Sequence, residues 1–222
     1  TGELAHRISR VVRLSSGDRV VLFNGSGIDM VARLDSVSKN RVSATISSHV
    51  TSITEPDLSI TLYQGLIKGD KFEWVLQKGT ELGISRFVPI ICERTIPSVT
   101  FTESDQKIKR WRKILVESAE QCGRSVVPIL SSPIDFVSAC RGLDPDSLAI
   151  MPWESAQGCS LRRVIGANQG KKTSVFIGPE GGFQAEEVEF AKTCGMLPVS
   201  LGPRIFRSET AGIVVTVALM YE

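Results

Sequence analysis

Two glycine-rich loops, each placed directly after a short apolar run, dominate the C-terminal part of this sequence. The apolar run Val175–Ile177 leads into the loop Gly178–Gly182, and the run Leu197–Leu201 leads into the loop Gly202–Arg207. Between them the spacing predicts a helix over Gln184–Cys194. In open parallel sheets, ligands bind in the crevice outside the carboxyl ends of the strands. We therefore expect both loops to border one binding site.

The helices that follow these loops carry acidic residues where they begin. Glu186 and Glu187 fall in the first turn of the predicted Gln184–Cys194 helix, where negative charge suits the helix dipole. Ser208 is expected to cap a last helix, with Glu209 in its first turn. Each loop thus runs from a strand end into a helix start.

The N-terminal part follows a different pattern. A short helix is predicted within Leu4–Leu14, followed by closely spaced β-prone runs with turn signals between them. Such spacing indicates hairpins and a small antiparallel sheet or barrel. Glu55–Asp57 has the composition of a linker, so we expect domains at 1–56 and 57–222. The predicted strands are Arg19–Phe23, Ile28–Val37 and Arg41–Val50.

From Leu58 onward, β-prone runs alternate with helical ones, a pattern typical of a mostly parallel α/β domain. Gly79 lies inside a predicted helix, where glycine costs about 1 kcal/mol relative to alanine; either close packing or a ligand would explain it. The strands are predicted at 58–67, 86–92, 126–130 and 147–151, and the helices at 69–83, 103–123, 133–141 and 161–165.

Composition narrows the function classes. The net charge of +2 is too small to indicate a nucleic-acid partner, although the middle of the chain is its most basic part. The 5 cysteines are scattered and the chain has only 2 histidines, so no metal site is expected and a reduced, cytoplasmic setting fits best. No run has the length of a membrane span, and no signal peptide is visible. The chain opens on Thr1, so we expect its natural N-terminus to be incomplete.

Two nucleotide-binding motifs are absent. Gly166–Thr173 approaches a phosphate-binding P-loop, but its spacing is one residue short and it precedes a strand. No Gly-x-Gly-x-x-Gly follows the first strand of the C-terminal part, which disfavours a dinucleotide-dependent oxidoreductase.

Several separated sequence blocks carry a family resemblance. Gly178–Phe183 together with Leu201–Ala211 resembles the signature of the RsmE family, which are 16S ribosomal RNA uridine-N3 methyltransferases of the SPOUT superfamily. The upstream blocks that match are Lys68–Lys71, Gln77–Gly83, Glu117–Arg124, and Arg13–Leu14 with Asn24–Gly27. The match covers nearly the whole chain. It departs from the family pattern at Phe206, usually Leu, and at Ser208, usually Thr.

The resemblance implies a fold and partners that no spacing argument reaches. It implies a small PUA-like β-barrel for RNA at the N-terminus. It also implies a SPOUT parallel sheet with helices on both faces and a C-terminal trefoil knot. The family uses S-adenosyl-L-methionine, needs no metal, and works as a cytoplasmic homodimer. Its target is a uridine in the decoding region of the small-subunit ribosomal RNA, within the assembled 30S subunit.

The resemblance also implies which residues hold the cofactor. The glycines of the first loop would let the backbone approach it, and Leu201, Gly202, Ile205 and Phe206 would surround the adenine. For Met151 and Pro152 the alternative is a place in the core and in a turn. The full set is Met151, Pro152, Gly178, Glu180, Gly181, Gly182, Leu201, Gly202, Ile205, Phe206 and Thr210.

Uridine N3 is a neutral imide that must lose its proton as it attacks a methyl group, so the site needs a proton acceptor or anion stabiliser. We expect Arg207 to hold the uridine oxygens, Arg204 to hold the knot loop or the methionine carboxylate, and Glu209 to take the proton. The alternatives are an ion pair for each arginine and a simple dipole partner for Glu209.

Basic residues of the middle region are candidates for phosphate contacts. A lysine on a helix is otherwise part of a solvated face, and Arg124 has a second role available, with Glu81 and Gln121, between the two middle helices. The candidates are Lys68, Lys71, Lys78, Arg94, Arg112 and Arg124. Two rival functions remain: a related methyltransferase acting on another RNA site, and a non-catalytic RNA-binding protein with the same fold.

Overall fold

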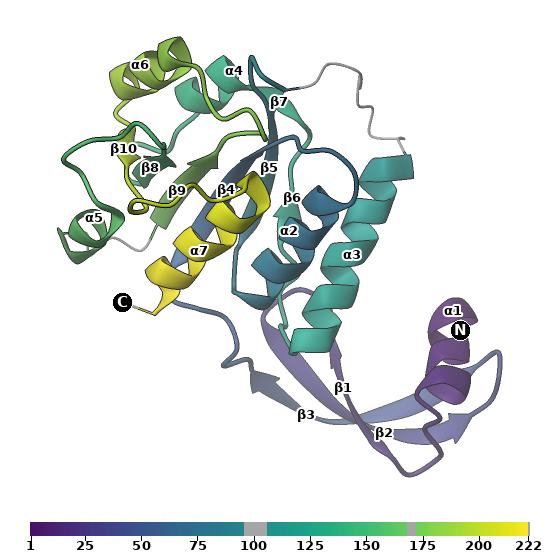
Figure 1. The fold of residues 1–222 in the computed structure, drawn as a ribbon. Helices are drawn as coiled ribbons and strands as arrows, with labels where there is room; N and C mark the ends of the chain where they lie inside the picture. Colours follow the sequence, from purple (N-terminus) through teal and green to yellow (C-terminus); the bar gives the residue numbers. More distant parts are fainter. Residues whose placement is uncertain (96–105, 168–171, 222) are drawn as a thin grey trace. The chain divides into compact units, whose positions relative to one another are not determined.

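The computed structural model describes residues 1–95, 106–167 and 172–221 (Figure 1). The chain divides into two compact units. Unit 1 comprises Thr1–Glu55 and the short segment Gly123–Val126, and unit 2 comprises Pro56–Cys122 and Val127–Glu222. No local pattern in the sequence predicts that Gly123–Val126, from the middle of the chain, groups with unit 1.

Unit 1 is built on a three-stranded antiparallel sheet in the order β1-β2-β3. The N-terminal helix and the first two strands are present as predicted. The third strand is also present, but it begins and ends one residue later than predicted. Within the described residues the sheet stays open rather than closing into a barrel, and its buried apolar side chains are few (Ala5, Ala32 and Leu34). The elements are α1 (Gly2–His6), a π-helical turn (Arg7–Val11), β1 (Arg19–Phe23), β2 (Ile28–Val37) and β3 (Val42–Thr51).

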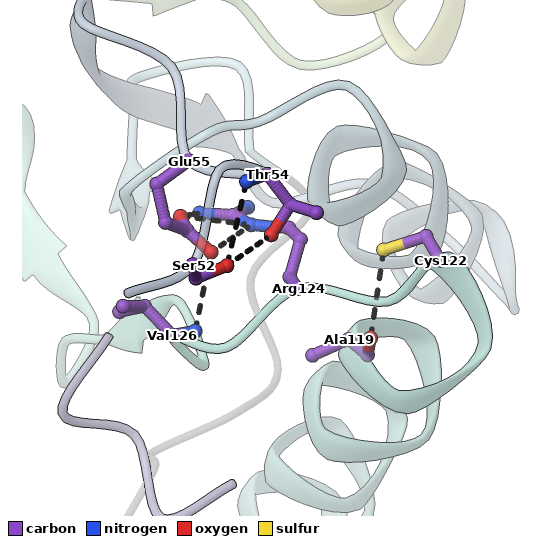
Figure 2. A network of polar contacts seen from close by, with 7 residues as sticks. All are labelled: Ser52, Thr54, Glu55, Ala119, Cys122, Arg124 and Val126. Carbon is purple, nitrogen blue, oxygen red and sulfur yellow. Dashed lines mark hydrogen bonds and ion pairs between the residues drawn. The ribbon is translucent and has the colours of Figure 1, made fainter. Parts of the chain in front are cut away.

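The segment Gly123–Val126 is fixed to the rest of unit 1 by a polar clasp (Figure 2). The guanidinium of Arg124 pairs with the carboxylate of Glu55 at 2.7 Å, and the Val126 N–H donates to the same carboxylate at 3.1 Å. The hydroxyl of Ser125 donates to Asp29. Arg124 is only 4% exposed. Its charge is therefore balanced by Glu55 inside unit 1. This corrects the prediction that Arg124 contacts an RNA phosphate.

Unit 2 is a seven-stranded sheet in the order β10-β8-β9-β4-β5-β6, with β7 also pairing with β5. Every strand pair in it is parallel, as the alternation of strands and helices predicts. The strands are β4 (Ser59–Gly65), β5 (Arg86–Ile91), β6 (Ile129–Leu130), β7 (Ile134–Asp135), β8 (Leu148–Pro152), β9 (Lys172–Ile177) and β10 (Leu197–Val199).

Helices cover both faces of this sheet (Figure 1). Ile60 and Leu62 of β4 point to one face and pack with α2, α3 and α7, whereas Val88 and Phe176 point to the other and pack with α4 and α6. The helices are α2 (Lys71–Glu81), α3 (Gln106–Cys122), α4 (Phe136–Arg141), α5 (Leu161–Ala167), α6 (Ala185–Thr193) and α7 (Ser208–Met220).

Two local predictions are refined by the structure. A Cβ on Gly79 would lie 2.7 Å from side-chain atoms of Ile84 and Phe87, so close packing explains this glycine. The predicted 133–141 helix begins only at Phe136, because Asp135 caps it by accepting from the Ser138 N–H at 2.8 Å. Hydrogen bonds from the side chain and from the backbone N–H of Ser138 lower the pKa of Asp135. None of the helices in the described ranges is both long and apolar enough to cross a bilayer.

Candidate active site

The two glycine-rich loops lie side by side, because the strands that lead into them, β9 and β10, flank β8 in a parallel sheet. Together they line a cavity of about 390 Å³ that runs from Ile177–Phe183 to Ile205–Glu209 and is bordered by Lys71. A second cavity, of about 190 Å³, adjoins it over Ser200–Phe206. Pro152, at the end of β8, borders both cavities. The site thus sits at the carboxyl edge of the sheet.

The first loop owes its glycines to its own packing. A Cβ on Gly178 would lie 3.1 Å from the backbone of Gly182, and Gly182 has a φ of +68° that favours glycine. Arg94 donates to the carbonyl oxygen of Gly181 at 2.7 Å. Arg94, expected to contact RNA, therefore also holds the loop that borders the larger cavity.

A buried hydrogen-bond chain joins three distant segments beneath the cavity. The side-chain amide of Gln64, on β4, donates to the Ser208 hydroxyl at 2.8 Å, and that hydroxyl donates to the carbonyl of Gly178. The Ser208 hydroxyl therefore bonds to two distant segments of the chain and does not cap a helix. The expected cap by Ser208 is wrong: α7 has Arg207 as its N-cap residue, with no side-chain cap hydrogen bond.

One lysine lies between two carboxylates at the rim of the larger cavity. Lys71 Nζ is 3.5 Å from Glu209 Oε1 and 4.0 Å from Glu180 Oε1. Glu180 also accepts a hydrogen bond of 2.9 Å from the backbone N–H of Lys68. The Glu209 side chain is only 13% exposed, and within the described ranges its buried Oε2 has no hydrogen-bond partner. A buried carboxylate oxygen without a partner can accept a hydrogen bond from a ligand at low cost.

The second loop presents both apolar and cationic groups. Ile205 is exposed and Phe206 is half-buried, although both line the cavities. Gly202 has a φ of +102° and open space where a Cβ would be. Arg207 borders the larger cavity and Arg204 the smaller one. Both arginines are exposed and, in the part of the chain that the structure describes, neither forms an ion pair.

Not every expected residue faces the cavities. Met151 is fully buried among Phe176, Phe183 and other core residues, which matches the alternative of a core position. Thr210 is half-buried and lines neither cavity. Among the RNA candidates, Lys68 and Arg112 are exposed, and Lys78 pairs with Glu81 at 2.9 Å.

Sequence reasoning missed the role of Gln64 and the pairing of Lys71 with the acidic residues of the site. Gln64 is fully buried at the end of a central strand, in a run that is otherwise largely apolar. A polar side chain in such a strand was the available signal, because buried polar groups need hydrogen-bond partners. The approach of Lys71 had no local signal, since it joins residues more than a hundred positions apart.

The cysteines do not extend the site. Burial raises the pKa of Cys92 and raises that of Cys140 to about 12, so both thiols stay protonated at neutral pH. Across residues 1–95, 106–167 and 172–221, no group of His, Cys, Asp or Glu side chains is arranged to hold a metal ion.

Comparison with known proteins identifies the family. A model of an RNA methyltransferase domain matches residues 54–220, and a model of an RNA methyltransferase PUA domain matches residues 1–47. Ribosomal RNA small subunit methyltransferase E of Bacillus subtilis is 34% identical over 100% of this chain and 89% of its own length. The chain belongs to the RsmE family. The resemblance stated from the sequence blocks is thereby confirmed, and so is the PUA-like character of the N-terminal part.

Solved structures of RsmE proteins and related methyltransferases share the fold. A putative methyltransferase from Legionella pneumophila, solved with its bound cofactor SAM, superposes with a TM-score of 0.89 at 32% identity and covers 99% of this chain and 89% of its own. The small subunit methyltransferase E of Neisseria gonorrhoeae, bound to S-adenosyl methionine, gives a TM-score of 0.89 at 30% identity with the same coverages.

Proposed function

We propose that this RsmE-family protein is an S-adenosylmethionine-dependent methyltransferase that methylates N3 of a uridine in 16S ribosomal RNA. The observation that carries the proposal is the pair of adjoining cavities formed by the two loops of the family signature, with Arg207 and Glu209 at their border. Relatives that cover nearly the whole chain carry the same enzyme name, and two similar structures hold the cofactor.

The residues that line the cavities fit S-adenosylmethionine. Gly202 leaves open space beside its backbone, and Leu201, Ile205 and Phe206 offer apolar surface to an adenine ring. When bound, the cofactor supplies a methyl group on a sulfonium sulfur. Pro152, Gly178, Glu180, Gly181 and Gly182 would form the remaining wall. Met151 and Thr210 line neither cavity, so they would support this wall without touching the cofactor.

The polar residues of the site would bind the uracil and the methionine part of the cofactor and accept the N3 proton. Arg207 would hold the uracil oxygens, since a guanidinium presents several donors in a fixed plane. Arg204, at the smaller cavity, would bind the methionine carboxylate or the knot loop. Glu209 would accept the proton that leaves N3, because its Oε2 has no partner within the described residues.

For RNA, exposed cations on unit 2 would bind phosphates. Lys68, Lys78, Arg94 and Arg112 remain candidates, whereas Arg124 is buried within unit 1. The PUA-like unit would add a second RNA contact. The substrate would be the small-subunit RNA within the assembled 30S particle, which places the enzyme in the cytoplasm.

The decisive experiment transfers a labelled methyl group from S-adenosylmethionine to 30S subunits that lack the modification and then maps the modified nucleotide. We expect one labelled uridine, modified at N3. Gly202→Val should abolish cofactor binding in calorimetry, because a β-branched residue is strained at a φ of +102° and its side chain would enter the cavity. Label on another base or another RNA would favour the related-methyltransferase alternative, and no cofactor binding by the wild type would contradict the proposal.

We also propose the trefoil knot that the resemblance implies. It is supported by the family to which the chain belongs. Stretching the chain from its two ends should leave it shorter than its full extended length. Extension to the full length would exclude the knot.

A homodimer is the third structural proposal. Helix α7, which packs beside α2 (Figure 1), has a mostly apolar sequence, yet its Val217 is 39% exposed. Helices that are apolar all round are normally buried. Light scattering should give twice the chain mass for the wild type and a lower mass for Val217→Glu. An unchanged mass in the variant would place the interface elsewhere.

A further inference from the structure

We propose that Lys71 and Glu209 act as a pair that reads the N3 edge of the target uracil, with Glu209 accepting the N3 hydrogen and Lys71 donating to a neighbouring carbonyl oxygen. The inference rests on the proposed N3 methylation of uridine. It assigns to Lys71 a role in recognising and activating the base, in place of the phosphate contact expected from the sequence.

The surroundings of Lys71 argue against a phosphate partner. Its ammonium lies within 4.0 Å of the carboxylates of both Glu180 and Glu209, so this rim of the cavity is acidic overall. A phosphate bound at Lys71 would also lie close to both carboxylates, and their repulsion opposes the attraction of the single ammonium. Uracil, in contrast, is neutral and offers two oxygen acceptors.

The donors of Lys71 are also available. Its distances to the two carboxylates are those of ion pairs, and within the described ranges its ammonium makes no hydrogen bond. The side chain is 40% exposed and borders the larger cavity. One of its three N–H groups can therefore reach a base oxygen while the charge stays beside Glu209.

Glu209 supplies the complementary group. Oε1 lies nearest to Lys71, while the buried Oε2 has no partner in the part of the chain described by the structure. A buried acceptor without a partner is unfavourable, so a ligand donor at this point gains binding free energy. The N3–H of uracil is such a donor.

This arrangement of one acceptor beside one donor matches uracil and opposes cytosine. Uracil presents the N3–H donor between two carbonyl acceptors. Cytosine presents an acceptor at N3 and an amino donor next to it, so both polar groups of the enzyme would face like groups. Sites built to hydrogen-bond a substrate reject analogues that leave these groups unpaired.

The pair also serves the chemical step. Glu209 accepts the N3 proton as the bond from N3 to the methyl carbon forms and the bond from sulfur to that carbon breaks, its electron pair remaining on sulfur. Lys71 stabilises the negative charge that develops on the adjacent uracil oxygen as the proton leaves. A fixed cation aimed at developing charge is the usual source of such stabilisation.

The test compares Lys71→Met, Lys71→Arg and Lys192→Met in single-turnover methyl transfer to 30S subunits. Lys192 is a matched control, because it is a similarly exposed lysine on a helix, pairs with Glu189 at 2.6 Å and lines neither cavity. We expect Lys71→Met to lower the rate about 100-fold to 1,000-fold, as for the loss of one donor to developing charge. The Kd values for cofactor and RNA should stay within about threefold, and Lys71→Arg should recover part of the rate. Lys192→Met should behave as the wild type.

A double variant tests whether the two residues act as a unit. Lys71→Met combined with Glu209→Gln should be hardly slower than the slower single variant, since effects within one unit are not additive. Lost cofactor affinity in Lys71→Met would assign Lys71 to the methionine carboxylate instead. Lost RNA affinity at an unchanged rate would restore the phosphate contact, and a wild-type rate would overturn the proposal. Failure of the wild type to modify uridine N3 would overturn the proposed function itself.

Discussion

Glu209→Gln should slow single-turnover methyl transfer about 100-fold to 10,000-fold, the range over which a positioned general base contributes. The amide keeps the size of the side chain but cannot take the N3 proton. Because Oε2 has no partner in the described residues and the side chain is largely buried, no water-filled route replaces it readily. The measurement is a rapid-quench assay with labelled cofactor and enzyme in excess over 30S subunits.

The matched control for this variant is Glu186→Gln. Glu186 also lies in the first turn of a helix, α6, but it is exposed and lines neither cavity. If Glu209 merely complements the dipole of α7, both variants should lose the same few tenths of a kcal/mol of stability and neither should lose rate. An unchanged rate in Glu209→Gln with normal cofactor binding would move the proton acceptor to another group.

The parallel sheet was predictable because its signal is local. Strands β4 and β9 are short β-prone runs that end at or directly before a glycine, and helices α2 and α3 each carry an apolar stripe of their own. The helix from Ala185 to Thr193 lies within one residue of the predicted range at each end. Its start follows from a local contact, because the Glu187 side chain accepts a hydrogen bond of 2.8 Å from the Gln184 N–H. Local patterns of this kind need no knowledge of the rest of the fold.

Parts of the site were beyond such reasoning because they depend on distant residues. The Ser208 hydroxyl had a local role available as a cap, but Gln64 and Gly178 engage it instead. From its basic surroundings in the sequence, Arg124 is predicted to be an exposed phosphate contact. In the structure it forms an ion pair with Glu55 inside unit 1. In both cases a tertiary partner outweighs the local preference, and single-sequence patterns do not indicate which partner that is.

Gly65→Ala should damage both stability and cofactor binding, since Gly65 is the point at which β4 touches the first loop. A Cβ there would lie 2.5 Å from the Pro179 nitrogen and 2.7 Å from the Gly178 carbonyl carbon. Both are backbone atoms, so no flexible side chain can move aside. Overpacking of this kind costs about 1–3 kcal/mol, which corresponds to a drop of about 2–12 °C in Tm for a chain of this size.

The loss of binding follows from the direction of the required shift. Relief of the clash moves Gly178 and Pro179 away from β4, and both residues line the larger cavity. The hydrogen bond from Ser208 to Gly178 would be strained as well, so the start of α7 and Glu209 would move with the loop. We expect at least a tenfold rise in the cofactor Kd, since a loss of about 1.4 kcal/mol suffices for that. Gly166→Ala is the control, because its Cβ would meet nothing within 4 Å on a helix where alanine is the better former. Wild-type melting and wild-type affinity in Gly65→Ala would show that β4 does not set the position of the loop.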